Sequence, residues 1–233
     1  MYKNLHFKES LENVKDVLEL SNKENISNKN YIRMVDKNSG KILINRRENI
    51  VTHRGRTFAL EKLYEDVNDS SDYPIKNHQR IINLFSVGSG GCQVGSPFDP
   101  ILPTPLDTNL TTPIPFKETS AGNAVDIDLA KYPVAPTVSV LSGKDLYYHK
   151  RFKILDPEWL ISRNTNTVYK KLELLIDMDD CRTSINNDDT INELGLYFST
   201  DTFTQPELYS RVTFPTEPLT GNKKILVEYY TFA

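Results

Sequence analysis

The last third of the chain, residues 191–233, decides the fold class. Three runs rich in β-branched and aromatic residues lie within it: INELGLYF (191–198), LYSRVTFP (208–215) and KILVEYYTF (224–232). Turn-forming residues bound each run, as they usually bound strands. The pattern predicts three antiparallel strands. We expect the third to be built into a sheet, because untethered termini are usually loose and polar and this run reaches almost to residue 233.

Further strand patterns lie upstream of this stretch. Alternating or continuous apolar runs occupy residues 31–36, 41–46, 81–87, 137–142, 145–154 and 168–178. The first two flank DKNSG (36–40), a cluster of turn formers that ends in glycine, and therefore predict a hairpin. Many short strands joined by irregular loops are typical of packed antiparallel sheets. We expect a mainly β protein, with an antiparallel, jelly-roll-like β-sandwich over residues 31–233.

Helical patterns are few within this expected domain. Thr52 can cap a helix whose apolar face would be supplied by Phe58, Leu60, Leu63 and Tyr64. A single helical turn is expected at 156–161, where Pro157 suits the first position. The polar segment 66–78 is expected to be a surface loop.

The N-terminal segment, residues 1–30, is predicted to be a helical arm followed by a linker. Leu11, Val14 and Leu18 recur at helical spacing among charged residues over 8–21, and a polar run follows over 21–30. This helix could pack on the sheet of its own domain or dock on a neighbouring subunit. Both alternatives stay open, because the stability of such a helix must come from packing.

A proline-rich segment interrupts the strand patterns. Six prolines fall between residues 97 and 115. Proline removes a backbone donor and favours extended or turn conformations. Because a long irregular segment is uncommon in a compact domain and is often functional, we expect residues 97–115 to form an extended arm or lid along another surface.

Composition argues against several classes of protein. The 233 residues include 28 basic and 31 acidic side chains, whereas a general nucleic-acid binder is usually more basic. The sequence contains no run of about 18 apolar residues, so no membrane-spanning helix is predicted, and the first residues lack the pattern of a signal peptide. Cys92 and Cys181 do not make a disulfide framework and indicate free thiols in a reducing cytosol. We expect no membrane partner and no direct nucleic-acid partner.

The glycine run GSGG at 88–91 follows a predicted buried strand. Successive backbone N–H groups of this kind can bind an anion. A phosphate loop would continue with lysine and serine or threonine, and a dinucleotide fingerprint would need glycine at position 93, but Cys92 and Gln93 follow instead. A tight turn at the end of the strand is the favoured interpretation.

Two clusters of charged residues are candidate binding sites. Calcium could bind an acidic stretch, but its spacing does not match an EF-hand, and a solvated turn is favoured. Phosphates or an acidic partner could meet a basic cluster, but no aromatic ladder accompanies it, and a solvated surface is favoured. The acidic stretch is Asp177, Asp179, Asp180, Asp188, Asp189 and Glu193, and the basic cluster is Arg46, Arg47, His53, Arg54 and Arg56.

No arrangement of residues predicts catalysis. The histidines do not pair with one another or with cysteine at zinc-ligand spacing, and Cys92 has no local nucleophile signature. Carboxylate pairs occur, but any protein of this size offers such pairs. We expect no enzyme activity, no catalytic residue, no metal site and no cofactor. The histidines are His6, His53, His78 and His149, and the carboxylate pairs are Asp126 with Asp128 and Asp156 with Glu158.

Three motifs together resemble virion structural proteins of tailed bacteriophages, from the tail, baseplate or neck. The first is IVTHRGR (50–56) before a short helix, similar to an I-T-x-x-G-R opening in that family. The second is the strand at 81–87 that runs into the glycine run and a proline-containing loop. The third is NELGLY (192–197) followed by LYSRVTFP (208–215), similar to an E-x-G-L-F … L-x-A-R-x-x-F ending. Ser210 stands where alanine is commoner, and the proline-rich segment is longer than usual.

The resemblance implies a non-enzymatic subunit of a virion that is assembled in the host cytoplasm. A place in the tail baseplate or tail tip is expected, with a neck or collar position as the alternative. Partners would be other virion proteins and copies of the chain in a ring, contacted through residues 1–30 and 97–115. A different class, a carbohydrate-binding module, would use an aromatic platform from Tyr147, Tyr148, Trp159, Tyr197 and Tyr209, although such residues more often pack in a core.

Overall fold

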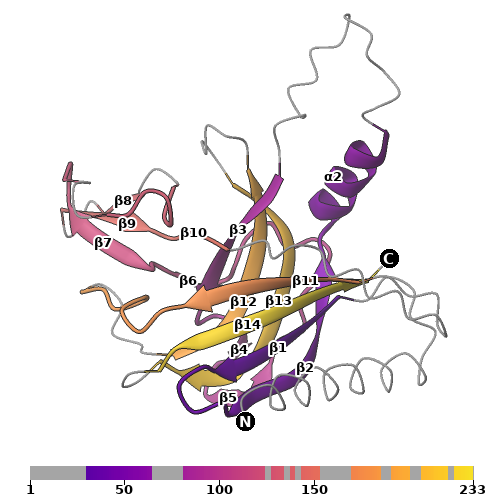
Figure 1. The fold of residues 1–233 in the computed structure, drawn as a ribbon, viewed down its shortest axis with the longest axis horizontal. Helices are drawn as coiled ribbons and strands as arrows, with labels where there is room; N and C mark the ends of the chain where they lie inside the picture. The colour runs from indigo at the N-terminus through magenta and orange to yellow at the C-terminus, as the bar shows by residue number, and fades with distance from the viewer. Residues whose placement is uncertain are drawn as a thin grey trace, which may run out of the picture.

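The computed structural model describes nine stretches of the chain, and within them the protein is mainly β (Figure 1). The predictions for residues 8–21, 66–78 and 156–161 lie outside the described residues. The mainly β, antiparallel class is confirmed, whereas the jelly-roll-like sandwich stays a prediction. The described residues are 30–64, 81–123, 127–133, 137–139, 143–152, 169–184, 190–199, 206–219 and 223–232.

The strands form one large sheet and two small ones, and every strand pair is antiparallel. The large sheet has the order β10-β3-β12-β13-β2-β1-β14-β11, with β6 beside β3. Its members are β1 (Asn30–Asp36), β2 (Ile42–Val51), β3 (Ile81–Gly88), β6 (Pro113–Ile114), β10 (Lys150–Arg151), β11 (Tyr169–Ile176), β12 (Thr190–Ser199), β13 (Glu207–Pro218) and β14 (Ile225–Phe232). The small sheets are β4 (Cys92–Gln93) with β5 (Ser96–Pro100), and β7 (Lys117–Ser120) with β9 (Lys144–Tyr147) and β8 (Thr137–Ser139).

The large sheet curls into a half-barrel, and β2 is the strand at its corner. Most of β2 pairs with β1, but Ile50 and Val51 at its end pair with Arg211 and Ser210 of β13. Figure 1 shows β1, β14 and β11 running across β3, β12 and β13. Side chains from both halves enter a single core, in which Phe85, Leu196 and Val212 meet Met34, Leu174 and Val227. Because the sheet curls, its two halves bury their apolar faces against each other.

The predicted hairpin and C-terminal strands are confirmed. Asp36 organises the turn between β1 and β2, because its carboxylate accepts hydrogen bonds from the Ser39 hydroxyl at 2.6 Å and the Asn38 N–H at 3.1 Å. Gly40 takes a φ of 70°, which favours glycine. β12 and β13 form a second hairpin. The last strand, β14, is built into the sheet as expected, but it pairs with β1 and β11 rather than with β13.

The remaining strand predictions differ mainly in length. Residues 137–142 contain the three-residue β8, and residues 145–154 are divided between β9 and β10. The alternation at 168–178 is confirmed as β11, in which Leu172, Leu174 and Ile176 are buried. The apolar pattern therefore predicted strand positions well and strand ends poorly.

The predicted Thr52-capped helix is α2 (His53–Tyr64). The Thr52 hydroxyl accepts a hydrogen bond from the Gly55 N–H at 3.0 Å, which confirms the cap. Phe58 is buried and stacks on Phe198 at 4.6 Å. The predicted apolar face is wrong at Leu60, which is 55% exposed, because only one side of the helix meets the sheet.

Candidate functional site

The glycine run does bind an anion, but the anion is a carboxylate of the chain itself. Glu193 of β12 is fully buried. Its carboxylate oxygens accept hydrogen bonds from the backbone nitrogens of Gly90 at 3.1 Å, Thr111 at 3.1 Å and Thr112 at 2.9 Å. A Cβ added at Gly88 would lie 2.4 Å from a Glu193 oxygen. Glycine is therefore required here for a close approach of the backbone, and the Gly90 N–H that an external phosphate would need already binds Glu193.

Arg211 of β13 completes this buried network. Its Nε and Nη2 donate to one oxygen of Glu193 at 3.1 and 2.6 Å, its Nη1 donates to Asp107 at 2.8 Å, and its Nη2 also donates to the Thr111 hydroxyl at 2.7 Å. Burial alone would raise the pKa of Asp107, but hydrogen bonds from Arg211 and from Thr104 outweigh burial and leave that pKa below its ordinary value. The network joins the hairpin β12–β13 to the proline-rich segment.

The proline-rich segment consequently lies on the outer face of its own sheet. Leu110 is buried there, and the side chain of Asn109 accepts the Tyr197 hydroxyl at 2.5 Å. The Thr213 hydroxyl donates to the backbone oxygen of Ile101 at 2.6 Å. The surface along which residues 97–115 lie in the structure thus belongs to the same chain, and contact with another subunit stays a prediction.

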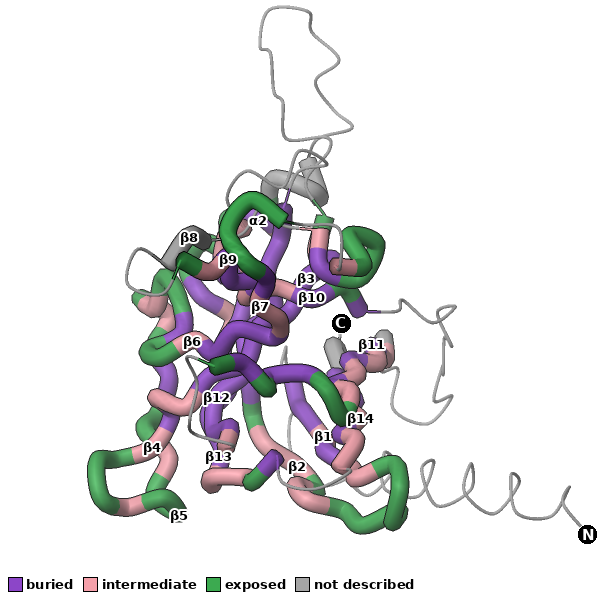
Figure 2. Tube along the Cα trace, turned by 90° about the vertical axis from the view of Figure 1, so that its left-hand side faces the viewer, coloured by how far each residue is buried: buried purple, intermediate pink, exposed green. Residues whose placement is uncertain are grey.

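Anchoring leaves one stretch of this region strongly apolar and exposed. Val94, Phe98, Leu102 and Leu106 have exposed fractions of 104%, 79%, 76% and 77%. We call residues 94–106 the exposed apolar segment. Figure 2 shows its β4–β5 hairpin as largely exposed. Single exposed apolar residues are common, but several in one short segment mark an interaction surface.

The basic cluster is divided between two elements. Arg46 and Arg47 of β2 line an open groove of about 460 Å³ together with Glu48, Ile50, Leu102 and Pro103. His53, Arg54 and Arg56 lie exposed on α2, where Arg54 pairs with Glu207 at 3.4 Å. The solvated interpretation therefore fits the α2 part, whereas the β2 part borders the exposed apolar segment.

Three residues of the acidic stretch, Asp177, Asp179 and Asp180, pair with lysines. Lys150 contacts Asp180 at 2.5 Å and Asp177 at 3.0 Å, and Lys117 contacts Asp179 at 2.5 Å. Asp180 is only 2% exposed, so the solvated-turn interpretation is wrong for this residue. Across the described stretches, no group of three or more histidine, cysteine, aspartate or glutamate side chains is placed to hold a metal ion. Asp188 and Asp189 lie outside those stretches, and Glu193 belongs to the Arg211 network.

The other titratable candidates are separated in space or lie outside the described residues. His149 packs edge-on against Tyr197, and burial lowers its pKa to about 4. Cys92 is half-buried and its Sγ lies 3.3 Å from the backbone oxygen of Phe214, whereas Cys181 is buried and burial raises the pKa of its thiol. Asp128 is exposed. The positions outside the described residues are His6, His78, Asp126, Asp156 and Glu158.

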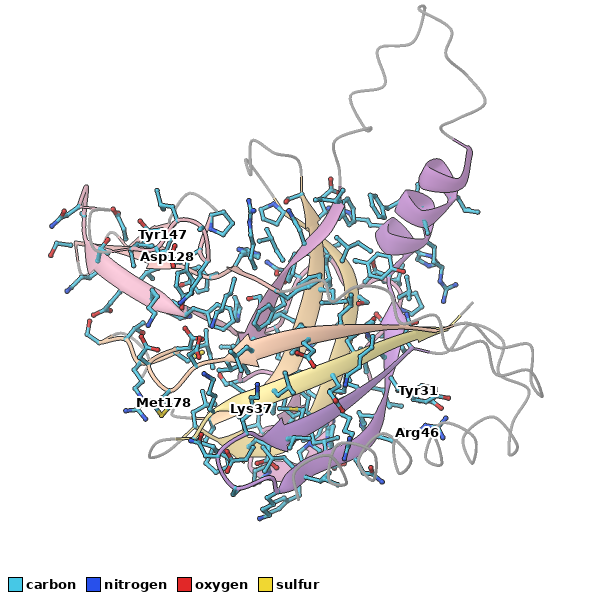
Figure 3. All side chains as sticks on the ribbon, viewed as in Figure 1. Tyr31, Lys37, Arg46, Asp128, Tyr147 and Met178 are labelled. Atoms are coloured by element: carbon cyan, nitrogen blue, oxygen red, sulfur yellow. The ribbon has the colours of Figure 1, made fainter. Side chains whose placement is uncertain are left out.

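The aromatic platform proposed for sugar binding is wrong at two of its five positions. Tyr147 and Tyr197 are each only 2% exposed and cannot stack on a surface sugar. Figure 3 shows Tyr147 in the small β7–β9–β8 sheet. Tyr148 and Tyr209 are partly exposed, and Trp159 lies outside the described residues.

Sequence reasoning missed the Glu193–Arg211 pair, although a signal for it was present. Each residue is a lone charge inside a predicted apolar strand, and the two strands are neighbours in sequence. Pairing the strands as a hairpin brings the two charges to diagonal positions on neighbouring strands, with Glu193 opposite Thr213 and Arg211 opposite Gly195. A buried charge needs a partner, so opposite charges in adjacent strands predict an ion pair.

Comparison with known proteins adds no relative. No protein-family model matches the chain, and neither the curated proteins nor the solved structures contain a match. Among the described residues, no helix combines the length and the apolar character needed to cross a bilayer.

Proposed function

We propose that this protein is a non-enzymatic structural subunit of a tailed-bacteriophage virion. Its place would be the baseplate or tail tip, with a neck or collar position as the alternative. The observation that carries an assembly role is the exposed apolar segment, in which four large apolar side chains are each more than three-quarters exposed. A surface of this kind fits a subunit that buries it against a partner.

The anchoring of this segment supports the same role. Asp107 and Thr111 flank its far end and are tied to Arg211, which is itself tied to the buried Glu193. A surface that is already ordered loses less conformational entropy when it binds. Holding apolar side chains in place on an ion network is therefore consistent with a preformed contact between subunits.

The phage motifs support the virion setting, because their residues have structural tasks in the site. The glutamate of the E-x-G-L pattern is Glu193, and the arginine of the L-x-A-R pattern is Arg211. Within the I-T-x-x-G-R opening, Thr52 caps α2 and Gly55 approaches the backbone of Tyr209 so closely that a Cβ would lie 2.2 Å from its oxygen. The motifs thus fall on residues that hold the sheet, α2 and the proline-rich segment together.

The finer fold belongs to this proposal. The two halves of the curled sheet share one core, which is consistent with a jelly-roll-like sandwich. Residues 1–30 would add a helical arm to residues 31–233. In the virion, copies of the chain would meet head-to-tail in a ring and contact neighbouring tail or neck proteins, after assembly in the host cytoplasm.

Purified particles test the proposal directly. Phage particles produced from a genome that encodes the chain should contain it in a fixed copy number, measured by quantitative mass spectrometry. Particle assembly should stall when the chain carries Phe98→Asp and Leu106→Asp together. The isolated double variant should keep its unfolding temperature, because both side chains are exposed. Leu129→Asp, at a position that is 54% exposed in another part of the chain, is the matched control. Complete particles without the protein, or normal assembly of the double variant, would overturn the proposal.

A further inference from the structure

We infer that the groove lined by Arg46, Arg47, Ile50, Leu102 and Pro103 is the docking site for residues 8–21 of the same chain. Such docking would occur in the free subunit, whether or not the chain belongs to a virion. It would place an acidic, amphipathic segment over part of the exposed apolar segment. The chemistry of the groove, the sequence of its occupant and the length of the tether each support this assignment.

The groove combines positive charge with apolar surface. Arg46 is held in place by Tyr31, whose ring centroid lies 3.8 Å from the guanidinium carbon, and Figure 3 shows the two side by side. Arg47 is fixed by a 2.9 Å hydrogen bond from its Nε to the backbone oxygen of Thr213. Among the described residues of the lining, two arginines stand against one carboxylate, that of Glu48, so this part of the groove carries a net positive charge. An occupant should therefore be acidic and should carry an apolar stripe to cover Leu102.

Residues 8–21 have this composition. The sequence KESLENVKDVLELS contains four carboxylates and two lysines, a net charge of about −2. Leu11, Val14 and Leu18 recur at helical spacing and would form one stripe. A helix of this length extends about 21 Å, and it gains stability mainly by packing that stripe against another surface.

The tether favours the same chain over a second copy. Residues 22–29 separate the segment from Asn30, the first residue of β1, and can span up to about 28 Å. Asn30 pairs with Asn49 of β2, which lies between the groove residues Glu48 and Ile50. A tether of so few residues gives an effective concentration of the order of mM, far above a second copy present at about 1 μM.

Disulfide trapping in the full-length chain tests the assignment. We would combine Val14→Cys with Leu102→Cys in a Cys92→Ser background, because Cys181 is buried. Mild oxidation at about 1 μM protein should give an intramolecular disulfide, seen as a faster-migrating monomer and identified by mass spectrometry. The matched control combines Val14→Cys with Leu129→Cys, at an exposed position away from the groove. It should react at least about tenfold more slowly, because docking would raise the effective concentration of the position 14 thiol at position 102 and not at position 129.

Charge reversal supplies a second readout that needs no added cysteine. In the full chain, Arg46→Glu should raise the hydrogen-exchange rates of backbone amides in residues 11–19 by about tenfold, the effect of weakening docking by one decade. Adding Glu12→Arg should restore their protection. Covalent dimers in place of monomers would assign the groove to a second copy and overturn the inference. Equal trapping rates for the two cysteine pairs, or exchange unaffected by Arg46→Glu, would also overturn it.

Discussion

Replacing Glu193 with glutamine should destabilise the protein more than any exposed charge substitution. The Glu193 carboxylate is fully buried and accepts five hydrogen bonds, three from backbone N–H groups and two from Arg211. Glutamine keeps the shape, but it removes the negative charge and turns an N–H₂ group toward donors. Among the described residues, Arg211 would then retain only Asp107 as a charged partner, and its side chain lies in a site where the residue is 6% exposed.

The expected loss in unfolding free energy is about 3 kcal/mol. Breaking a buried ion pair by removing one partner costs roughly 3–5 kcal/mol, and the remaining contact with Asp107 places Glu193→Gln at the lower end. For a chain of this size that corresponds to a fall of about 6–12 °C in Tm. Calorimetry or circular dichroism would measure it. Hydrogen exchange should quicken at the backbone amides of Gly90, Thr111 and Thr112, which donate hydrogen bonds to the Glu193 carboxylate.

Glu207→Gln is the matched control, because it makes the same chemical change in a partly exposed pair with Arg54 at 3.4 Å. Its effect should stay below about 1 kcal/mol. In a double-mutant cycle with Arg211→Met, the double variant should lose less stability than the sum of the two single variants. A loss below about 1 kcal/mol for Glu193→Gln, or additive effects in the cycle, would refute the view that this pair anchors the proline-rich segment.

Three further outcomes are expected. The folded state favours neutral His149, whose pKa is about 4 against about 6.5 unfolded, so its contribution to stability is present above pH 6.5 and is lost as the pH falls toward 4. Between pH 8 and pH 5 this loss is about 2 kcal/mol, and His149→Phe should flatten that part of a stability–pH curve measured by denaturant unfolding. Gly91→Ala should lower the free energy of unfolding by at least about 2 kcal/mol in the same assay, since the new Cβ would lie 2.2 Å from the backbone oxygen of Asn192. An unchanged stability would contradict this close approach. Cys92 should react with a thiol reagent in the native state and Cys181 only on unfolding, whereas equal native rates would show that Cys181 is not buried as described.

The sequence predicted local structure better than the arrangement of strands. The hairpin after Asp36, the Thr52 cap and the alternation in β11 depend on neighbouring residues, whose periodicity and turn chemistry are visible in the chain. The pairing of β14 with β1 joins residues almost two hundred positions apart, and no local pattern encodes it. The corner in β2 has no local sequence signal either, because it depends on where β13 lies in the sheet.

The candidate site shows the same division. Six prolines mark the proline-rich segment as unusual in the sequence, and the exposed apolar side chains lie in it and in the hairpin before it. Its attachment to its own sheet was not foreseen, since that attachment depends on two lone charges, Glu193 and Arg211, meeting in a hairpin. Similarly, Asp180 read as a surface turn residue because its partner Lys150 is thirty residues away in sequence.

The place of β14 between β1 and β11 constrains when the protein can fold. Tyr31 near the start of β1 pairs with Tyr230, so the large sheet lacks the strand that joins β11 to β1 until residues 225–232 have left the ribosome. During synthesis, β1 and β11 would each present an unpaired strand edge that can recruit another nascent chain. Molecular chaperones that bind extended apolar strands would act in this interval, and slowing translation before residue 225 should lower the yield of soluble protein.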